Sequence, residues 1–269
     1  MSADPATDRR ALTEQQYVDS GNLVARQSIY AFQRPVSDIW GGSLDLAALR
    51  GDETILDIGC GNGLYLGVLR ARGHTGVVCG ADLSAGMLRS ARPAAGGGPL
   101  LVSDAQAIPF ADDTFDLTLA MHMLYHVPDR AVAIAELRRV LRPEGVALVV
   151  TNSEAHFQEL DDLIVECAAA ATGITRLPVR SYIHFTAESG APELAAQFSS
   201  VETRDFVSEL VVDQVGPALD YARSMSTFVA DTDGQLEGVL DELGRRLAAV
   251  IASQGAFRVT TSVRCFACR

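Results

Sequence analysis

Three alternating glycines follow a short apolar segment, and an acidic residue stands two positions before the first of them. The stretch reads Asp57-Ile58-Gly59-Cys60-Gly61-Asn62-Gly63, and a helix is expected to begin near Leu64. Glycines permit positive φ and a close backbone approach, and amides at a helix N-terminus face a ligand. A dinucleotide fingerprint, G-x-G-x-x-G, would need its third glycine at position 64. The spacing therefore favours a loop for another ligand; a tight turn without a ligand is the alternative.

Acidic residues also end the next two apolar segments. Asp82 precedes Leu83 and Ser84, and Asp104 precedes Ala105. An acid at the place of Asp82 can accept hydrogen bonds from ribose hydroxyls, as in other doubly wound folds. The alternative is that Asp82 caps the following helix, but Ser84 is the better N-cap. Ribose binding is therefore favoured for Asp82.

Two histidines follow the fourth apolar segment, in Ala120-Met121-His122-Met123-Leu124-Tyr125-His126. Strand ends in open α/β sheets border the ligand crevice. The pKa of a histidine suits a general base. His126 and His122 are therefore candidate catalytic residues, and lining a pocket wall is the alternative for both.

The segments between these residues alternate between strand-like and helical patterns. Short apolar runs are found at 54–58, 76–81, 99–103, 115–121 and 145–151, and helical stretches at 63–71, 84–92 and 128–141. Such alternation predicts an α/β fold in which helices cover both faces of a mostly parallel, doubly wound sheet. Pro143 and Gly145 are expected to end the last of these helices.

The flanking regions are predicted as helical additions around the same sheet. Residues 8–50, 154–172, 214–229 and 235–253 look helical, 173–200 reads as loop and short helix, and 201–212 and 257–268 read as strands. We expect an N-terminal cap over 1–50, a core over 51–152, an inserted lid segment over 153–200 and a C-terminal part of the sheet over 201–269.

Four motifs carry a family resemblance across about residues 50–152. They are D-x-G-x-G-x-G from Asp57, D-L-S-x-G-M-L from Asp82, the stretch around Asp104, and Glu136 to Gly145. In order and spacing they resemble class I methyltransferases that use S-adenosylmethionine (SAM), in the branch of ubiquinone/menaquinone-biosynthesis-like and other small-molecule enzymes. The resemblance implies a Rossmann-like sheet of seven strands with the last one antiparallel, plus helical caps.

The same resemblance implies SAM as cofactor and S-adenosylhomocysteine as product. It assigns the glycine loop to the amino-acid end of SAM, Asp104 and Ala105 to adenine, and His126 to the acceptor side. The predicted cofactor residues are Asp57, Gly59, Cys60, Gly61, Gly63, Asp82, Leu83, Met87, Asp104, Ala105, Met121 and His122.

The methyl acceptor is expected to be a small molecule, with O-, N- and C-methylation left open. The chain lacks the N-P-P-Y motif associated with amino-methylation of adenine or glutamine. An arginine-rich, lysine-free sequence suggests bacterial specialised metabolism. The alternatives are a protein methyltransferase and a SAM-binding protein without methyl transfer. Predicted acceptor-binding residues are Tyr17, Tyr30, Trp40, Tyr125, His126 and His156.

Composition narrows the remaining classes. All 22 cationic residues are arginine, which excludes a P-loop and a pyridoxal Schiff base, since both need lysine. The net charge of −12 disfavours a nucleic-acid partner. No apolar run reaches the ~20 residues of a membrane span, and no secretory signal is visible, so a cytoplasmic protein is expected. The five cysteines predict free thiols, and no metal site is expected; a homo-oligomer remains open.

Overall fold

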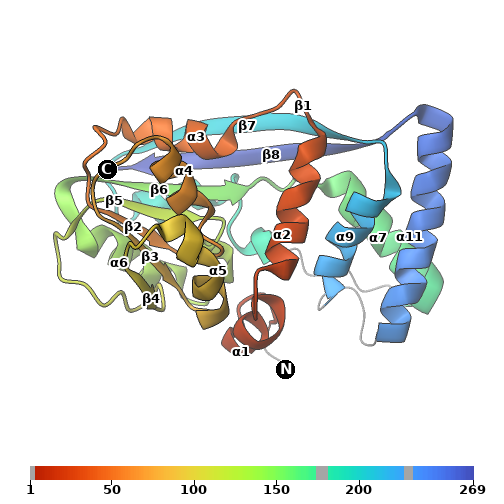
Figure 1. The fold of residues 1–269 in the computed structure, drawn as a ribbon, viewed down its shortest axis with the longest axis horizontal. Coiled ribbons are helices and arrows are strands. Elements are labelled where there is room, and N and C mark those ends of the chain that lie inside the picture. Colours follow the sequence, from red (N-terminus) through yellow and green to blue (C-terminus); the bar gives the residue numbers. More distant parts are fainter. Residues whose placement is uncertain (1–3, 174–180, 227–232) are drawn as a thin grey trace.

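The computed structural model describes residues 4–173, 181–226 and 233–269. These residues contain one sheet with the strand order β1-β7-β8-β6-β5-β2-β3-β4 (Figure 1). The strands are β1 Gln33–Arg34, β2 Ile55–Ile58, β3 Val78–Asp82, β4 Leu100–Val102, β5 Phe115–Met121, β6 Leu141–Asn152, β7 Val201–Val212 and β8 Phe257–Cys268.

Strands β2 to β6 pair in parallel, and β8 is antiparallel to both β6 and β7. The predicted α/β class and mostly parallel sheet are confirmed, but the number of seven strands is wrong, because β1 adds an eighth. This strand pairs only Gln33 with Leu210 and Arg34 with Glu209 at the edge of β7. Two residues are too few to show an alternating pattern in the sequence.

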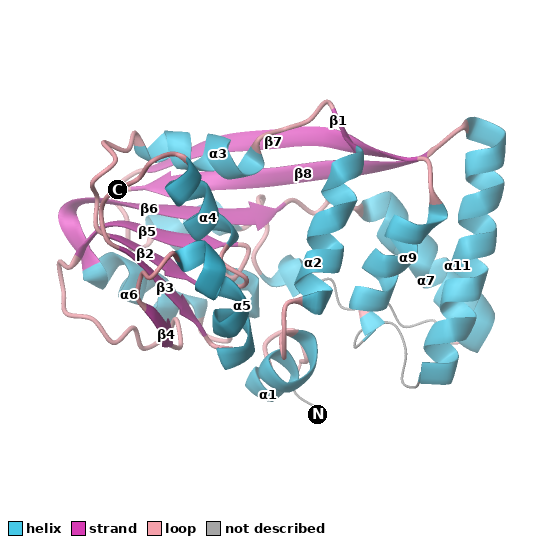
Figure 2. Ribbon diagram, viewed as in Figure 1, coloured by secondary structure: helices cyan, strands magenta, loops and turns pink. Residues whose placement is uncertain are grey.

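Helices surround the sheet and form a separate group at one end of it (Figure 2). The α-helices are α1 Arg9–Ala11, α2 Gly21–Ser28, α3 Ile39–Leu44, α4 Leu64–Ala71, α5 Ala85–Ala95, α6 Arg130–Val140, α7 Gln158–Thr172, α8 Gly190–Ala195, α9 Val215–Ser224 and α11 Asp233–Gln254. Shorter turns of helix are η1 Leu12–Gln16, η2 Ile29–Phe32, η3 Asp45–Ala47, η4 Leu124–His126 and η5 Ser181–His184.

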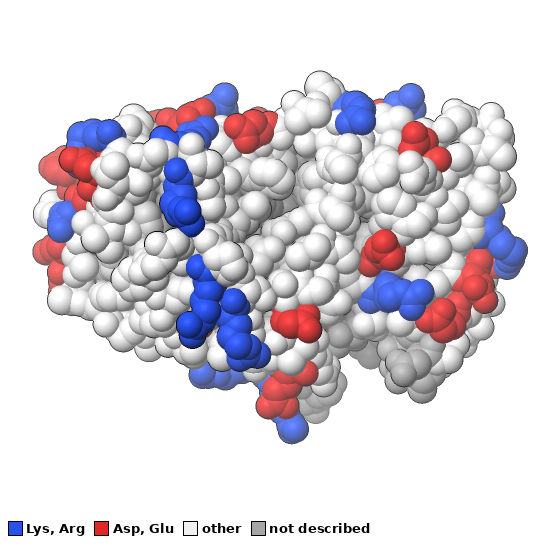
Figure 3. Space-filling model, viewed as in Figure 1, with Lys and Arg blue, Asp and Glu red and all other residues white. Residues whose placement is uncertain are grey.

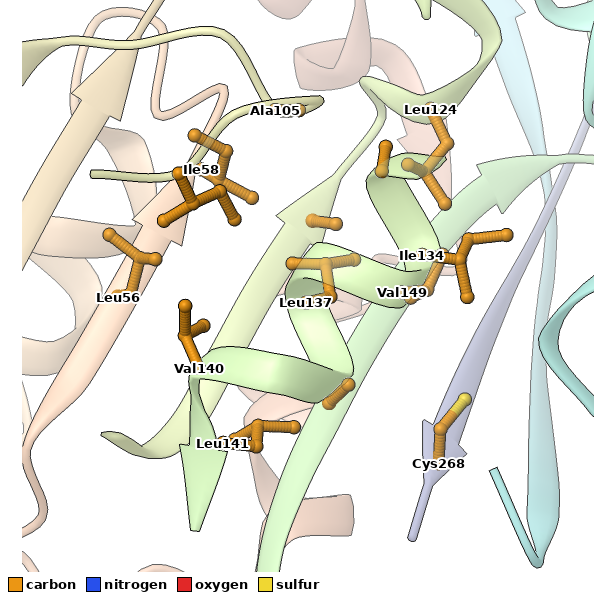
Figure 4. Packing of buried hydrophobic residues seen from close by; sticks show 14 of the residues in the cluster. Leu56, Ile58, Ala105, Leu124, Ile134, Leu137, Val140, Leu141, Val149 and Cys268 are labelled. Carbon is orange, nitrogen blue, oxygen red and sulfur yellow. The ribbon is translucent and has the colours of Figure 1, made fainter. Parts of the chain in front are cut away.

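The two faces of the sheet bury separate cores because side chains alternate along a strand. Leu56 of β2 and Leu137 of α6 belong to the core on one face, which Figure 4 shows from close by. The neighbouring Ile55 packs with Leu69 of α4 on the other face. This double coverage explains why the central strands read as continuous apolar runs.

A third core lies beyond the ends of β7 and β8. There α7, α9 and α11 pack against one another and against buried residues of the two long strands, including Leu210 and Val259. In Figure 1 these helices stand apart from the parallel part of the sheet, and α2 lies between the two groups. The third core therefore lies on the side of the molecule opposite the glycine loop.

The end of α6 differs from the prediction. The helix ends at Val140, and β6 already begins at Leu141, so Pro143 and Gly145 lie inside the strand and do not end the helix. Pairing of β6 with β5 shifts register between Phe115 and Leu117. This irregularity accommodates the proline in a strand that otherwise pairs on both sides.

Candidate active site

A cavity of about 510 Å³ lies over the carboxyl ends of the parallel strands. Its volume is typical of small-molecule sites, which span about 300–1,000 Å³. All predicted cofactor residues except Gly63 line it, and so do all six predicted acceptor residues. On the face shown in Figure 3, arginines lie singly or in short runs among uncharged and acidic residues.

Gly63 serves helix packing and does not line the cavity. It precedes α4 with φ of 83°, and a Cβ there would lie 3.0 Å from Ala94 Cβ and 3.1 Å from Ala91 Cα. Gly59 and Gly61, with φ of 73° and 55°, do line the cavity. The third glycine therefore brings α4 close to α5, while the first two shape the wall.

Asp57 is a buried carboxyl group without a counterion. The residue is 1% exposed, lines the cavity, and neither carboxyl oxygen has a hydrogen-bond partner in the described part of the chain. Burial, with a further contribution from the charge of Asp82, raises the pKa of Asp57 to about 8. A buried polar group without a partner is costly, so this position favours a ligand that carries a positive charge.

Asp82 is held by two backbone amides at the end of β3. The Gly61 amide donates to Oδ2 at 2.9 Å and the Ser84 amide donates to Oδ1 at 2.8 Å. Ser84 caps α5 by accepting from the amides of Gly86 and Met87, as the sequence predicted. Each carboxyl oxygen of Asp82 keeps a lone pair toward a ligand. Burial raises the pKa of Asp82, and the two amides oppose that shift.

Asp104 lies after β4 at the same edge of the sheet. Its Oδ1 accepts hydrogen bonds from the Gln106 amide and side chain, and its Oδ2 lies 3.8 Å from Nη1 of Arg9. Arg9 belongs to the N-terminal segment, which we define as residues 4–20. The segment therefore reaches across the cavity to the third of the three acids.

His122 has a left-handed backbone with φ of 56°, unusual for a residue other than glycine. Its amide donates to the Val150 carbonyl at 2.8 Å, which fixes the residue at the junction of β5 and β6. Burial lowers the pKa of His122 to about 4, against a smaller opposing effect of Asn152. The imidazole is therefore neutral near pH 7 and lines the cavity wall.

His126 is bonded on both ring nitrogens to the N-terminal segment. Nδ1 lies 2.8 Å from the Ala6 carbonyl oxygen and Nε2 lies 3.0 Å from the Tyr17 hydroxyl. Since a carbonyl only accepts, Nδ1 carries the hydrogen and Nε2 accepts from Tyr17. Arg26 in turn donates to the Tyr17 hydroxyl at 3.1 Å. Burial lowers the pKa of His126 to about 4, so the ring is neutral.

His156 pairs with Tyr30 in the opposite direction. The Ser262 amide donates to Nδ1 of His156 at 3.1 Å, so the neutral ring carries its hydrogen on Nε2. That hydrogen faces the Tyr30 hydroxyl, 3.2 Å away. Burial is the main reason that the pKa of His156 is lowered, to about 3. Burial also raises the pKa of Tyr30 above its usual range.

Several lining residues were not predicted as site residues. They come from the N-terminal helices, from the end of β6 and from the third core: Arg9, Leu23, Arg26, Gln27, Asn152, Phe157, Tyr221 and Met225. Asn152 carried a signal, since it ends β6 at the same edge as the motif residues. The others depend on the packing of distant helices, which no local pattern specifies.

The cysteines offer no second site in the described part of the chain, and of the five only Cys60 lines the cavity. All five cysteines are free, and Cys265 and Cys268 pack into different cores on opposite faces of β8, so they cannot share a ligand. The described residues contain no cluster of three metal-ligating side chains, and none of their helices is long and apolar enough to cross a membrane.

Comparison with known proteins gives the class of this site. Residues 56–149 match the family model described as a methyltransferase domain. This stretch contains the glycine loop, the acids after β3 and β4, and both histidines after β5. It is a methyltransferase domain of the class I, SAM-dependent type, which confirms the resemblance predicted from the motifs.

The matches to curated relatives cover about half of this chain or less. A malonyl-[acyl-carrier protein] O-methyltransferase of Serratia marcescens is 34% identical over 132 residues, 49% of this chain and 50% of that protein. The chain thus spans about half the length of the curated relatives it matches.

Two solved structures share the fold. A putative methyltransferase of Bacillus halodurans superposes with a TM-score of 0.59 over 87% of this chain and 99% of its own, at 18% identity. A Haemonchus contortus phosphoethanolamine N-methyltransferase, solved with phosphomonomethylethanolamine and S-adenosylhomocysteine, gives 0.54 over 98% of this chain and 60% of its own, at 19% identity. Identities this low show the fold alone.

Proposed function

We propose that this protein transfers the methyl group of SAM to a small-molecule acceptor. The observation that carries the proposal is the uncompensated Asp57, buried in the wall of a cavity that also exposes Asp82 and Asp104 at successive strand ends. SAM carries an ammonium group, a sulfonium, a ribose diol and an adenine. Asp57, Asp82 and Asp104 suit the ammonium group, the ribose diol and the adenine, in that order.

The fit follows from the chemistry of each acid. Asp57 would face the ammonium group of the amino-acid end, which compensates the burial of the carboxylate. Asp82, oriented by two amides, would accept from the ribose hydroxyls. Asp104 and the Ala105 amide would meet adenine, as the family resemblance implies. When bound, SAM supplies an activated methyl group; the chain's residues bind, orient and exclude water.

The N-terminal segment fits the role of excluding water. It is fastened to the core by Tyr17 on His126, by the Tyr17 carbonyl on Ser84 Oγ, and by Arg9 near Asp104. Because both nitrogens of His126 are used in these bonds, we assign His126 to holding the segment closed. A general-base role would require Tyr17 to leave Nε2 first.

Because its lowered pKa keeps the His122 imidazole neutral near pH 7, this side chain can line the region where the methyl group is transferred. Its backbone is fixed at the end of β5, between the cofactor acids and the third core. Sulfonium transfer needs in-line placement of the acceptor more than it needs a strong base. His122 is therefore assigned to shaping the wall beside the methyl group.

Calorimetry with S-adenosylhomocysteine tests the proposal. We expect micromolar binding by the full chain, no binding of NAD, and a loss of about 10–100-fold in affinity for Asp57→Asn, since a charged hydrogen bond is removed. Asp205→Asn, in an exposed pair with Arg264, is the matched control and should bind normally. Binding of NAD in place of S-adenosylhomocysteine would refute the proposal.

A further inference from the structure

The acceptor side of the cavity contains a chain of hydrogen bonds with a fixed direction. The Ser262 amide donates to His156 Nδ1, and His156 Nε2 donates to the Tyr30 hydroxyl oxygen. A backbone amide cannot reverse its role, so the direction of the whole chain is set at its start. Among the described residues, none accepts the hydrogen of the Tyr30 hydroxyl. That hydrogen is available to a ligand.

The second tyrosine–histidine pair shows why the direction matters. Tyr17 receives a hydrogen bond from Arg26 and gives its own hydrogen to His126, whose Nδ1–H is bound to the Ala6 carbonyl. Its hydroxyl is therefore fully used within the protein. Two pairs of the same composition thus do different work: the Tyr17 pair holds the N-terminal segment, and the Tyr30 pair presents a donor.

The position of Tyr30 places this donor on the acceptor side. The cofactor acids follow β2, β3 and β4, whereas Asn152 and His156 follow β6, beyond the end of β5. Tyr30 comes from η2 and lies between the end of β6 and the third core. The centroid of its ring lies 5.7 Å from the centroid of the Phe157 ring. The Tyr30 hydroxyl is therefore separated from the cofactor acids by His122.

The ring of Tyr30 packs against two apolar clusters of buried residues. Five cavity-lining residues belong to these clusters or pack against them: Ile39, Trp40, Phe157, Tyr221 and Met225. The lining carboxylates are those at the cofactor strand ends. The lining cation nearest to this part of the chain, Arg26, already donates to Tyr17, Gln16 and both oxygens of Ser224. A cationic acceptor would therefore find no carboxylate on this side, and an anionic one would find at most one unused N–H group of Arg26.

Resting on the proposed methyltransferase function, we infer that the acceptor is an uncharged, largely apolar molecule that presents a carbonyl, ether or hydroxyl oxygen to the Tyr30 hydroxyl. The donor chain from Ser262 through His156 selects a hydrogen-bond acceptor at this point. An ammonium group cannot accept this hydrogen bond, and a carboxylate or phosphate ester would bury a charge with little compensation. Tyr30 is thus a specificity-determining residue that touches the acceptor.

The test measures binding of four naphthalene probes to the full chain saturated with S-adenosylhomocysteine. Acetylnaphthalene offers a carbonyl oxygen, ethylnaphthalene matches its shape without one, and naphthoate and naphthylmethylammonium add a charge. Calorimetry should rank acetylnaphthalene about five- to tenfold above ethylnaphthalene, the worth of one hydrogen bond, and each ion at least tenfold below the ketone.

Variants separate the donor from general effects on the protein. Tyr30→Phe should abolish the preference for the ketone over the hydrocarbon while leaving ethylnaphthalene binding unchanged. Ser208→Ala, which removes a hydroxyl bonded to the Pro35 carbonyl outside the cavity, should keep the preference. A preference that survives in Tyr30→Phe, tighter binding of either ion, or no ketone binding at its solubility limit would overturn the inference.

The cofactor titration keeps this result apart from the proposed function. If S-adenosylhomocysteine binds but the probe ranking fails, the acceptor class is wrong and the methyltransferase proposal stands. If S-adenosylhomocysteine does not bind, the proposed function itself fails.

Discussion

The carbonyl oxygen of Val18 lies directly against Gly86 at the start of α5, where a Cβ would overlap it. One residue earlier, the Tyr17 carbonyl accepts a hydrogen bond from Ser84 Oγ at 2.6 Å. The N-terminal segment therefore docks on the first turn of the helix that follows Asp82. A glycine is required at position 86 because the approaching group is backbone and cannot rotate away.

The first prediction concerns this contact. Gly86→Ala should release the N-terminal segment, so that trypsin cleaves faster after Arg9 and Arg10, and S-adenosylhomocysteine should dissociate faster. Gly67→Ala in α4 is the matched control, because its Cβ would meet Ala94 Cβ at an ordinary 3.8 Å. That control should be neutral or stabilised by about 0.5–1 kcal/mol. Equal cleavage of Gly86→Ala and wild type would show that the contact does not hold the segment.

A truncation tests the same segment without changing the core. Removal of residues 1–20 should leave a folded chain that still binds S-adenosylhomocysteine, but with faster dissociation, since Tyr17 no longer covers His126. A longer deletion to residue 40 would also remove the fully buried Ile29 and strand β1. Stopped-flow dissociation rates check the prediction, and an unchanged rate would make the segment a bystander.

The pKa of Asp57 predicts how cofactor binding depends on pH. With this pKa near 8 in the free protein, the carboxyl group is largely protonated at pH 7. A cationic ligand prefers the ionised form, so affinity should rise with pH up to about 8, by at most about tenfold per unit, and binding should release a proton. Calorimetry in buffers of different ionisation enthalpy measures the proton; Asp57→Asn should release none. Affinity independent of pH between 6.5 and 8.5 would contradict this role.

The raised pKa of Asp57 has the opposite effect on the stability of the free protein, which should fall as the pH rises. A carboxyl group whose folded pKa lies above its usual 3.8 stabilises most at low pH, and this contribution is lost as pH rises toward 8. Asp57→Asn should therefore flatten the fall in melting temperature between pH 6 and pH 8. Parallel curves for the variant and wild type would show that Asp57 is already ionised without ligand.

His156 predicts acid sensitivity. Its folded pKa is about 3 against an ordinary 6.5, so the unfolded chain binds more protons between these values. Stability should be full above pH 6.5 and fall as the pH is lowered, by at most about 1.4 kcal/mol per unit from this residue. Urea unfolding of His156→Gln should show a shallower fall between pH 6.5 and pH 4. A steeper fall would assign the acid sensitivity to other groups.

Eleven of the twelve predicted cofactor residues line one cavity, and the sequence could bring them together because their positions depend on local pattern. Asp57, Asp82 and Asp104 each follow an apolar strand, and parallel strands end at one edge of a sheet. Gly63, which was also predicted for the cofactor, does not line the cavity and lies where α4 packs closely against α5.

The acceptor half was predicted only as a set of aromatic and histidine residues. The direction of the Tyr30 and Tyr17 pairs depends on Ser262 and Ala6, which lie 106 and 120 positions from their histidines. Partners that distant leave no pattern in the sequence. The same holds for Arg26, whose donors are fixed by Ser224 at the end of α9.

A crystal structure of the full chain with S-adenosylhomocysteine tests the central claim most directly. We expect the ammonium group within hydrogen-bond distance of Asp57 and both ribose hydroxyls bonded to Asp82. The adenine should lie beside Asp104 and Ala105, and the sulfur should face the part of the cavity lined by Tyr30. A ligand whose ribose does not contact Asp82, or whose amino-acid end leaves Asp57 without a partner, would contradict it.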